Sequence, residues 1–421
     1  MKAQYWLSLT LTAMLAACTL PRRDAPTALF SDASPPGFPP SIRFLSADPR
    51  QLAHLSEDAQ RLRTTSATHT ITMLALSGGG SVGAFGAGAL IGLSHRGARP
   101  EFQVVTGVSA GALLAPFAYL GPAWDPQLVE AFSGRATERL LRPRGLAVLY
   151  HPGWFRGEPL ADLVDHFVTD EMIDAVARER ARGRILAVAT TDLDSEETVI
   201  WDLGKIAAAG GEPARKLFRD ILVASASIPG LFPPVMIKVT SGTHTYDEMH
   251  VDGGATTPFF IVPEATFLTT MDPAILRDGS LYVLVNGQLS GRPQTTRIRS
   301  IPILSRSFAA VLKHTSRTAI IATAEFAAHY GMSFRFTSIP LDHAQVDPLD
   351  FRRSSMQALM QYGEHCAEAG LLWLTLEQSA QVSLMRAQRL AAQSANSAQR
   401  EPAGCPVDVA ALEAQNSPTN H

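Results

Sequence analysis

Long hydrophobic runs are absent after the first 18 residues, which argues against a membrane-spanning helix in the rest of the chain. A basic excess is absent too: the net charge of −3 argues against a nucleic-acid partner. Cysteine is scarce, and beyond the N-terminus only Cys366 and Cys405 are available for a disulfide, a pairing that the sequence leaves open. Hydrophobic residues at 46% against 18% charged residues support a sizeable core, in one large α/β domain or two ordinary ones.

The N-terminus has the pattern of an export signal. One lysine precedes an apolar run of about a dozen residues, and small residues follow before Cys18. The stretch Leu15-Ala16-Ala17-Cys18 resembles the bacterial lipobox, in which the cysteine is acylated; the alternative is an ordinary signal peptide with an incidental cysteine. We expect a lipoprotein signal peptide over 1–17 and a lipid anchor on Cys18. The protein would then be a membrane-anchored lipoprotein of the bacterial cell envelope, facing the periplasm or in the outer membrane.

Strand and helix patterns alternate through the middle of the chain. Residues 18–68 are expected to be a lipidated tether, rich in proline and serine up to residue 45, followed by a partly helical lead-in. Predicted strands cover 71–77, 102–107, 184–194, 197–203 and 281–287, with another ending at 252, and predicted helices cover 81–97, 110–120, 215–227, 307–330 and 354–376. Such alternation predicts a three-layer α/β/α fold with a mainly parallel central sheet over 69–375. A C-terminal helix and a loose tail are expected over 376–421.

One serine stands in the frame of a nucleophile. Ser109 lies between Gly107 and Gly111, in a G-x-S-x-G pattern that joins a predicted strand to a predicted helix. Glycines suit this corner because the backbone crowds itself there, and the start of the helix favours developing negative charge on the hydroxyl. The alternative is a tight turn with a capping serine.

A glycine run precedes this serine. Gly78, Gly79 and Gly80 follow a predicted strand and open a predicted helix, so their N–H groups are candidate donors to an oxyanion. Gly78, Gly80 and Gly83 also fit the dinucleotide pattern G-x-G-x-x-G, but the acidic residue expected about 20 positions later is missing. No lysine follows the run either, which excludes a Walker loop. A nucleotide-dependent oxidoreductase is therefore the lesser alternative.

A base for the serine is offered by Asp252, which ends a predicted strand and precedes Gly253 and Gly254. Burial would raise the pKa of an aspartate from near 3.9 and make it a better base. The alternatives are an ordinary Asp-Gly turn at this place and a histidine base, since the chain has twelve histidines. The same segment also allows a metal site or a polar surface hairpin, and its potential ligands are His244, Asp247, Glu248, His250 and Asp252.

Taken in order, these motifs resemble the patatin-like phospholipase family: the glycine run, G-x-S-x-G, and Asp252 with its two glycines. Residues 189–197 and 224–235 resemble further family blocks. The resemblance implies a patatin-like fold and a Ser109–Asp252 dyad, with Gly78, Gly79 and Gly80 as the oxyanion hole. It also implies an acyl-enzyme formed from membrane-lipid esters, as in a phospholipase A or lysophospholipase, with no cofactor and no catalytic metal. A non-catalytic lipid-binding lipoprotein is the alternative.

Two positions differ from the family pattern. Many members carry arginine or lysine where this chain has Val82, and an asparagine is frequent where it has Thr257. The first difference leaves open how the glycine loop is held. Separately, the segment 140–157 carries Tyr150, Trp154 and Phe155 among arginines, which predicts either contact with a membrane interface or a cap packed on the core.

Overall fold

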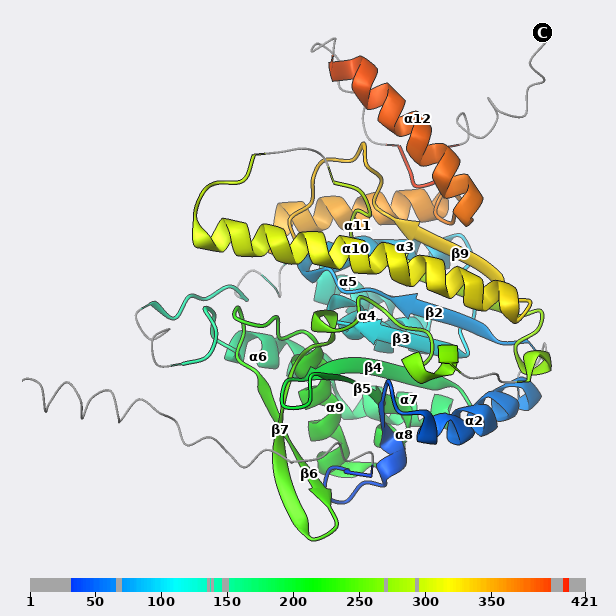
Figure 1. The fold of residues 1–421 in the computed structure, drawn as a ribbon, viewed down its shortest axis with the longest axis vertical. Coiled ribbons are helices and arrows are strands. Elements are labelled where there is room, and N and C mark those ends of the chain that lie inside the picture. Colours follow the sequence, from blue (N-terminus) through cyan, green and yellow to red (C-terminus); the bar gives the residue numbers. More distant parts are fainter. Residues whose placement is uncertain are drawn as a thin grey trace, which may run out of the picture.

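The computed structural model describes residues 32–65, 70–134, 137, 140–145, 151–268, 272–291, 295–394 and 404–408. Figure 1 shows helices on both sides of one central sheet. Within these ranges no helix combines the length and the apolar character needed to cross a bilayer.

The sheet has nine described strands, in the order β1-β5-β4-β3-β2-β8-β9, with β7 paired to β4 and β6 paired to β7. The strands are β1 (Arg43–Leu45), β2 (Thr72–Leu76), β3 (Val104–Val108), β4 (Ile185–Asp192), β5 (Glu197–Asp202), β6 (Val235–Ser241), β7 (His244–Asp252), β8 (Ser280–Val285) and β9 (Ser333–Ser338). The five central strands, β4, β3, β2, β8 and β9 in this order, pair in parallel with their neighbours. The pairs β1-β5, β5-β4, β4-β7 and β6-β7 are antiparallel. The predicted mainly parallel sheet is confirmed for its centre.

Both faces of this sheet are buried, as near-continuous apolar strands require. On β2, Leu74 and Leu76 join one core cluster, while Met73 and Ala75 join a second cluster on the opposite face. The described helices are α2 (Leu52–Thr65), α3 (Gly83–His95), α4 (Ala110–Leu120), α5 (Asp125–Phe132), α6 (Glu158–Phe167), α7 (Asp170–Ala181), α8 (Leu203–Ala209), α9 (Gly211–Ser225), α10 (Ser300–His329), α11 (Arg353–Glu368) and α12 (Leu376–Ser394). Helices α3, α4, α9 and α11 contribute to the first cluster and α10 to the second, which gives the three layers expected.

The end of the predicted tether differs from the structure. Ala33 is fully buried, and Ser34 exchanges two backbone hydrogen bonds with Thr240 of β6. Residues 43–45 form β1, which covers the edge of β5. Pairing with otherwise open strand edges explains why a proline-rich stretch is fixed here, because unpaired edge N–H and C=O groups need partners. Residues 18–31 of the tether lie outside the described residues.

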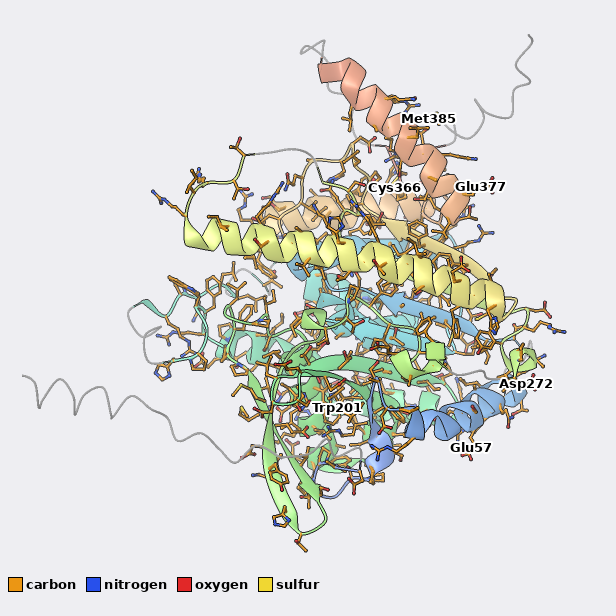
Figure 2. The ribbon with its side chains drawn as sticks, in the orientation of Figure 1. Glu57, Trp201, Asp272, Cys366, Glu377 and Met385 are labelled. Atoms are coloured by element: carbon orange, nitrogen blue, oxygen red, sulfur yellow. A yellow bond between two sulfur atoms is a disulfide. The ribbon has the colours of Figure 1, made fainter. Side chains whose placement is uncertain are left out.

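The predicted helix over 354–376 is too long. Helix α11 ends at Glu368, and Gly370 follows with φ +76°, a left-handed conformation that ends helices readily. Leu374 then exchanges two backbone hydrogen bonds with Phe336 of β9. The expected loose tail is also wrong for 404–408, because Cys405 forms a disulfide with Cys366 of α11 (Figure 2). Helix α12 itself is confirmed.

Candidate functional site

Ser109 sits on a sharp corner between β3 and α4. Its φ of 55° and ψ of −125° are unusual for a residue other than glycine. A side chain at Gly107 would place its Cβ 2.4 Å from the carbonyl oxygen of Gly111, and one at Gly111 would come within 2.2 Å of the carbonyl oxygen of Leu76. Both glycines are therefore required by the close approach of backbone to backbone, and the corner lifts the serine hydroxyl out of the strand.

The topology brings Asp252 to this hydroxyl across 143 sequence positions. Strand β4 lies between β3 and β7, and Asp252 pairs in register with Thr190 of β4. The Oγ of Ser109 donates a hydrogen bond of 2.5 Å to Oδ2 of Asp252. The other carboxylate oxygen, Oδ1, accepts the N–H of Gly254 at 2.7 Å. A Cβ at Gly253 would lie 2.5 Å from the carbonyl oxygen of Ala189, so that glycine is required by the packing of the turn on β4.

Burial sets the proton affinity of Asp252, whose residue surface is 2% exposed. Loss of solvent raises its pKa to about 7, although the hydrogen bonds from Ser109 and from the N–H of Gly254 act in the opposite direction. A carboxylate with a pKa near neutrality can take the serine proton and return it at physiological pH. A hydroxyl and a tuned base in direct contact are the parts that an acyl transfer needs.

The glycine loop lies against the serine but not all of its amides are free. Gly78 packs so closely that an added Cβ would be 3.0 Å from the Cβ of Ser109, yet its own N–H donates to the carbonyl of Pro258. Among the described residues, the N–H groups of Gly79, Gly80 and Ala110 have no hydrogen-bond acceptor. The expectation of three glycine donors is thus reduced to two. Ala110 was missed, although the residue after a nucleophile commonly donates to the oxyanion.

The glycine loop is held by residues 347–348, which are distant in the sequence. These contacts show how the loop is fixed although Val82 stands where many family members have arginine or lysine. The N–H of Ser81 donates to the carbonyl of Pro348 at 2.9 Å, and the Ser81 hydroxyl donates to the carbonyl of Asp347 at 3.0 Å. Gly80 has φ +55°, and a Cβ there would lie 2.2 Å from the same Pro348 oxygen. No signal in the sequence links positions 81 and 348.

An apolar cavity opens from the serine. The space between its walls, which includes a part open to solvent, is about 810 Å³. Apart from Ser109 and Thr137, its lining is apolar, with walls from α4, α5, α6, α7, α9 and α11 and from Phe351 just before α11. These walls include Leu113, Phe117, Leu160, Phe167, Leu222 and Met356. Such a cavity suits a hydrocarbon chain whose polar end lies at Ser109.

The potential metal ligands of β7 do not converge on one point with Asp252. Glu248 is paired with Arg43 at 2.7 Å and hydrogen-bonded to His250, and both partners outweigh the effect of burial and lower the pKa of Glu248 to about 2. The ring of His250 also contacts the hydroxyl of Thr190. Asp247 pairs with Lys238. These side chains form a buried ion-pair network and a surface pair, so the metal alternative gains no support.

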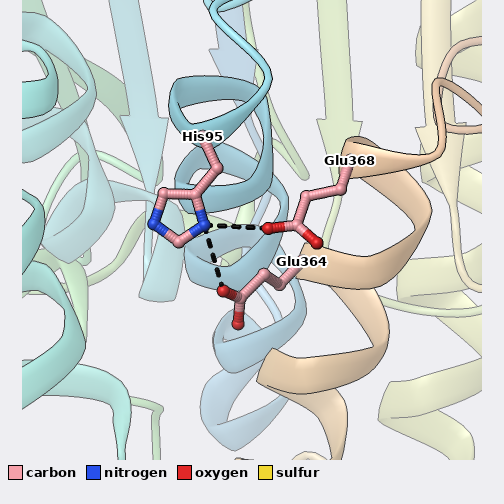
Figure 3. Close-up of side chains that lie close together, drawn as sticks. All are labelled: His95, Glu364 and Glu368. Carbon is pink, nitrogen blue, oxygen red and sulfur yellow. Dashed lines mark hydrogen bonds and ion pairs between the residues drawn. The ribbon is translucent and has the colours of Figure 1, made fainter.

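A different group of potential ligands lies at the ends of α3 and α11 (Figure 3). The Nδ1 atom of His95 is 2.8 Å from Glu368 and 3.3 Å from Glu364. The hydrogen bond to Glu368 raises the pKa of His95. Among the described residues this is the one trio with ligand atoms close enough to share a metal ion. All three side chains are substantially exposed, and the group acts as an ion pair that joins the two helices.

The remaining expected features are only partly placed. Phe155 packs against Phe232 with ring centroids 5.9 Å apart, as in the core-packed cap, whereas Trp154 is 46% exposed. Tyr150, the signal peptide and Cys18 lie outside the described residues.

One comparison with known proteins, the family model, supports the resemblance that the motifs give. Residues 74–263 match the family model described as Patatin-like phospholipase. Among solved structures, the chain resembles VipD from Legionella pneumophila at 12% identity and a TM-score of 0.35, over 72% of this chain and 67% of that one. No curated protein matches. The segments that hold Gly80 and close the cavity near α11 lie beyond the matched region.

Proposed function

We propose that the chain is a serine hydrolase with a Ser109–Asp252 dyad, on the premise that residues 74–263, which match the patatin-like phospholipase model, form a lipid acyl hydrolase domain. Its substrates are carboxylic esters of membrane lipids, cleaved in the manner of a phospholipase A or a lysophospholipase. The observation that carries the proposal is the 2.5 Å hydrogen bond between Ser109 and a buried aspartate with a pKa of about 7.

The reaction proceeds in two steps. As Ser109 Oγ attacks the ester carbonyl carbon, its proton moves to Oδ2 of Asp252, and the N–H groups of Gly79, Gly80 and Ala110 donate to the oxyanion. Collapse of the tetrahedral intermediate breaks the ester C–O bond, and Asp252 returns the proton to the leaving alcohol. Water then attacks the acyl carbon and gives its proton to Asp252. The bond from that carbon to Ser109 Oγ breaks, Asp252 returns the proton to Oγ, and the fatty acid leaves.

The cavity supports a long acyl group as the part of the substrate that is bound. Binding of an acyl chain between these apolar walls is stabilised by roughly 25 cal/mol per Å² of hydrocarbon surface removed from water. We therefore expect hydrolysis to become more efficient as the acyl chain of the ester lengthens, until the chain fills the cavity.

A fluorophosphonate probe tests the nucleophile. Wild type should be labelled, Ser109→Ala should not, and a matched control, Ser94→Ala, should be labelled like wild type. Labelling that survives Ser109→Ala would exclude Ser109 as the nucleophile. A folded wild type that takes no label and hydrolyses no lipid in a panel of phospholipids and lysophospholipids would favour the non-catalytic lipid-binding alternative.

The base is tested separately with Asp252→Asn, which keeps the shape of the side chain. We expect turnover to fall by at least about 100-fold, the usual contribution of general-base catalysis, while the fold is retained. Full activity in this variant would move the role of base to another residue, such as a histidine.

We also propose that Cys18 is acylated and holds the enzyme on a membrane of the bacterial cell envelope. The lipobox-like sequence before Cys18 supports this. Cys18→Ser should release the protein into the soluble fraction of the cell envelope, or leave its signal peptide uncleaved. A processed variant that sediments with membranes as wild type does would refute the acyl anchor.

A further inference from the structure

The segment around α10 differs in charge from the rest of the chain. Between Asp278 and Glu325 there is no acidic residue, whereas six arginines and lysines occur there, in a protein whose net charge is −3. On α10 itself, Arg306, Lys313 and Arg317 fall within about 40° of one another at 100° per residue. The burial of Lys313 and the charges of these two arginines lower its pKa, which agrees with their closeness. This surface attracts anions.

The outward side of the same segment carries large apolar side chains among its polar ones, whereas a surface helix ordinarily exposes mainly polar residues. Four of the eleven large exposed hydrophobic residues in the described part of the chain lie here: Ile298, Ile303, Val311 and Ile321. Ile298 is 96% exposed and stands between Arg297 and Arg299, which are exposed as well. Exposed apolar side chains beside clustered cations are typical of surfaces that lie in a bilayer interface.

The position of this surface suits the candidate site. Leu76 of β2 pairs with Gly107 on one side and Leu284 on the other, so β3 and β8 end at the same edge of the sheet. Ser109 follows β3 at this edge, and the chain that follows β8 leads to α10. In Figure 1 the N-terminal end of α10 lies at the same end of the molecule as α6, whose residues line the cavity.

We propose that the outer face of α10, together with residues 297–299, docks on an anionic lipid bilayer and brings the cavity to its substrate. The inference rests on the proposed function and specifies the surface from which the substrate enters. A bilayer is favoured over a nucleic acid because apolar side chains alternate with the cations, and over a second copy because the like charges of two such faces would repel.

The test uses the full chain with Cys18→Ser, so that no acyl group contributes to binding. Sedimentation is measured with vesicles of phosphatidylcholine alone and with vesicles of equal parts phosphatidylcholine and phosphatidylglycerol. We expect binding to the anionic vesicles that weakens as salt is raised. In the variant Arg297→Gln/Arg299→Gln/Lys313→Gln, vesicle affinity should fall at least about tenfold, since each cation near an anionic surface is worth about fivefold.

A matched control removes three exposed cations elsewhere, Arg182→Gln/Lys216→Gln/Lys238→Gln, and should bind the vesicles as the parent does. Ile298→Ser tests the apolar part and should weaken binding without loss of stability. Equal losses in both triple variants, equal binding to neutral and anionic vesicles, or dimerisation that the α10 variant abolishes would each overturn the proposal. Retention of a nucleic acid that the α10 variant releases would do the same.

A water-soluble short-chain ester separates this inference from the proposed function. The α10 triple variant should hydrolyse this ester at the parental rate and lose activity only on anionic vesicles. If the parent binds the vesicles but cleaves neither the short-chain ester nor the vesicle lipids, the proposed function fails and the docking surface stands.

Discussion

Replacement of Asp252 by asparagine should make the protein more stable than wild type at alkaline pH, while turnover falls by at least about 100-fold. The aspartate is buried, its pKa lies at about 7, and an unfolded chain would return it to 3.8. The folded state therefore holds the proton more tightly than the unfolded state does. Asparagine is uncharged at every pH and is isosteric, and its side-chain oxygen can still accept the N–H of Gly254.

The direction and size of the pH effect on stability follow from the linkage between protonation of Asp252 and folding. Because the folded pKa is the higher one, the stabilisation that this group provides is complete below pH 3.8 and is lost as the pH rises through 7. The difference between a pKa of 3.8 and one of about 7 corresponds to a total of about 4 kcal/mol. About 3 kcal/mol of this should disappear between about pH 5 and pH 8.5, the interval in which the folded carboxyl group ionises.

The assay is urea unfolding of wild type and Asp252→Asn at both pH values. Other groups titrate in both proteins, so the informative quantity is the difference between their two pH dependences. Between about pH 5 and pH 8.5, the free energy of unfolding of wild type should fall by about 3 kcal/mol more than that of the variant. Ser109→Ala keeps the buried carboxyl group but removes a hydrogen bond that lowers its pKa, so this variant should lose at least as much stability as wild type. Parallel pH dependences in wild type and Asp252→Asn would show that burial does not raise the pKa of Asp252, and the proposed base would lose its physical basis.

Three further outcomes are expected. The kcat/KM of wild type should rise with pH to a plateau above about 7 as Asp252 ionises, and a pH-independent rate would contradict a titrating base at this position. Gly111→Ala would force a Cβ against the carbonyl of Leu76, and it should cost at least about 2 kcal/mol of stability together with a loss of activity. Gly287→Ala, whose Cβ would meet no atom within 4 Å, should cost under about 1 kcal/mol. Equal effects of the two variants in thermal unfolding would refute the close approach at Gly111. Cys405→Ser opens a disulfide that spans 39 residues and should lower the unfolding free energy by up to about 4 kcal/mol, and an unchanged urea midpoint would show that the bond adds no stability.

The strand and helix pattern could be predicted where hydrophobic periodicity is strong. The run 71–77, the helix 110–120 and the strand 281–287 were each placed correctly to within two residues, because buried parallel strands and capped helices leave local signals. The end of α11 was predicted wrongly, because the apolar run after Gly370 fits a helix as well as a strand. The run pairs with β9 instead of continuing the helix because β9 has an open edge, and this edge exists only in the folded protein.

The sequence by itself determined the order of the motifs, and with it the nucleophile and base candidates, because a glycine at a crowded corner is a local requirement. Three other features depend on the tertiary structure alone. They are the contact of Ser109 with Asp252, the burial that raises the pKa of that carboxyl group, and the hydrogen bond from Ser81 to Pro348 that fixes the glycine loop. Each joins segments far apart in the chain. Solvent exclusion and strand register arise only when those segments pack together.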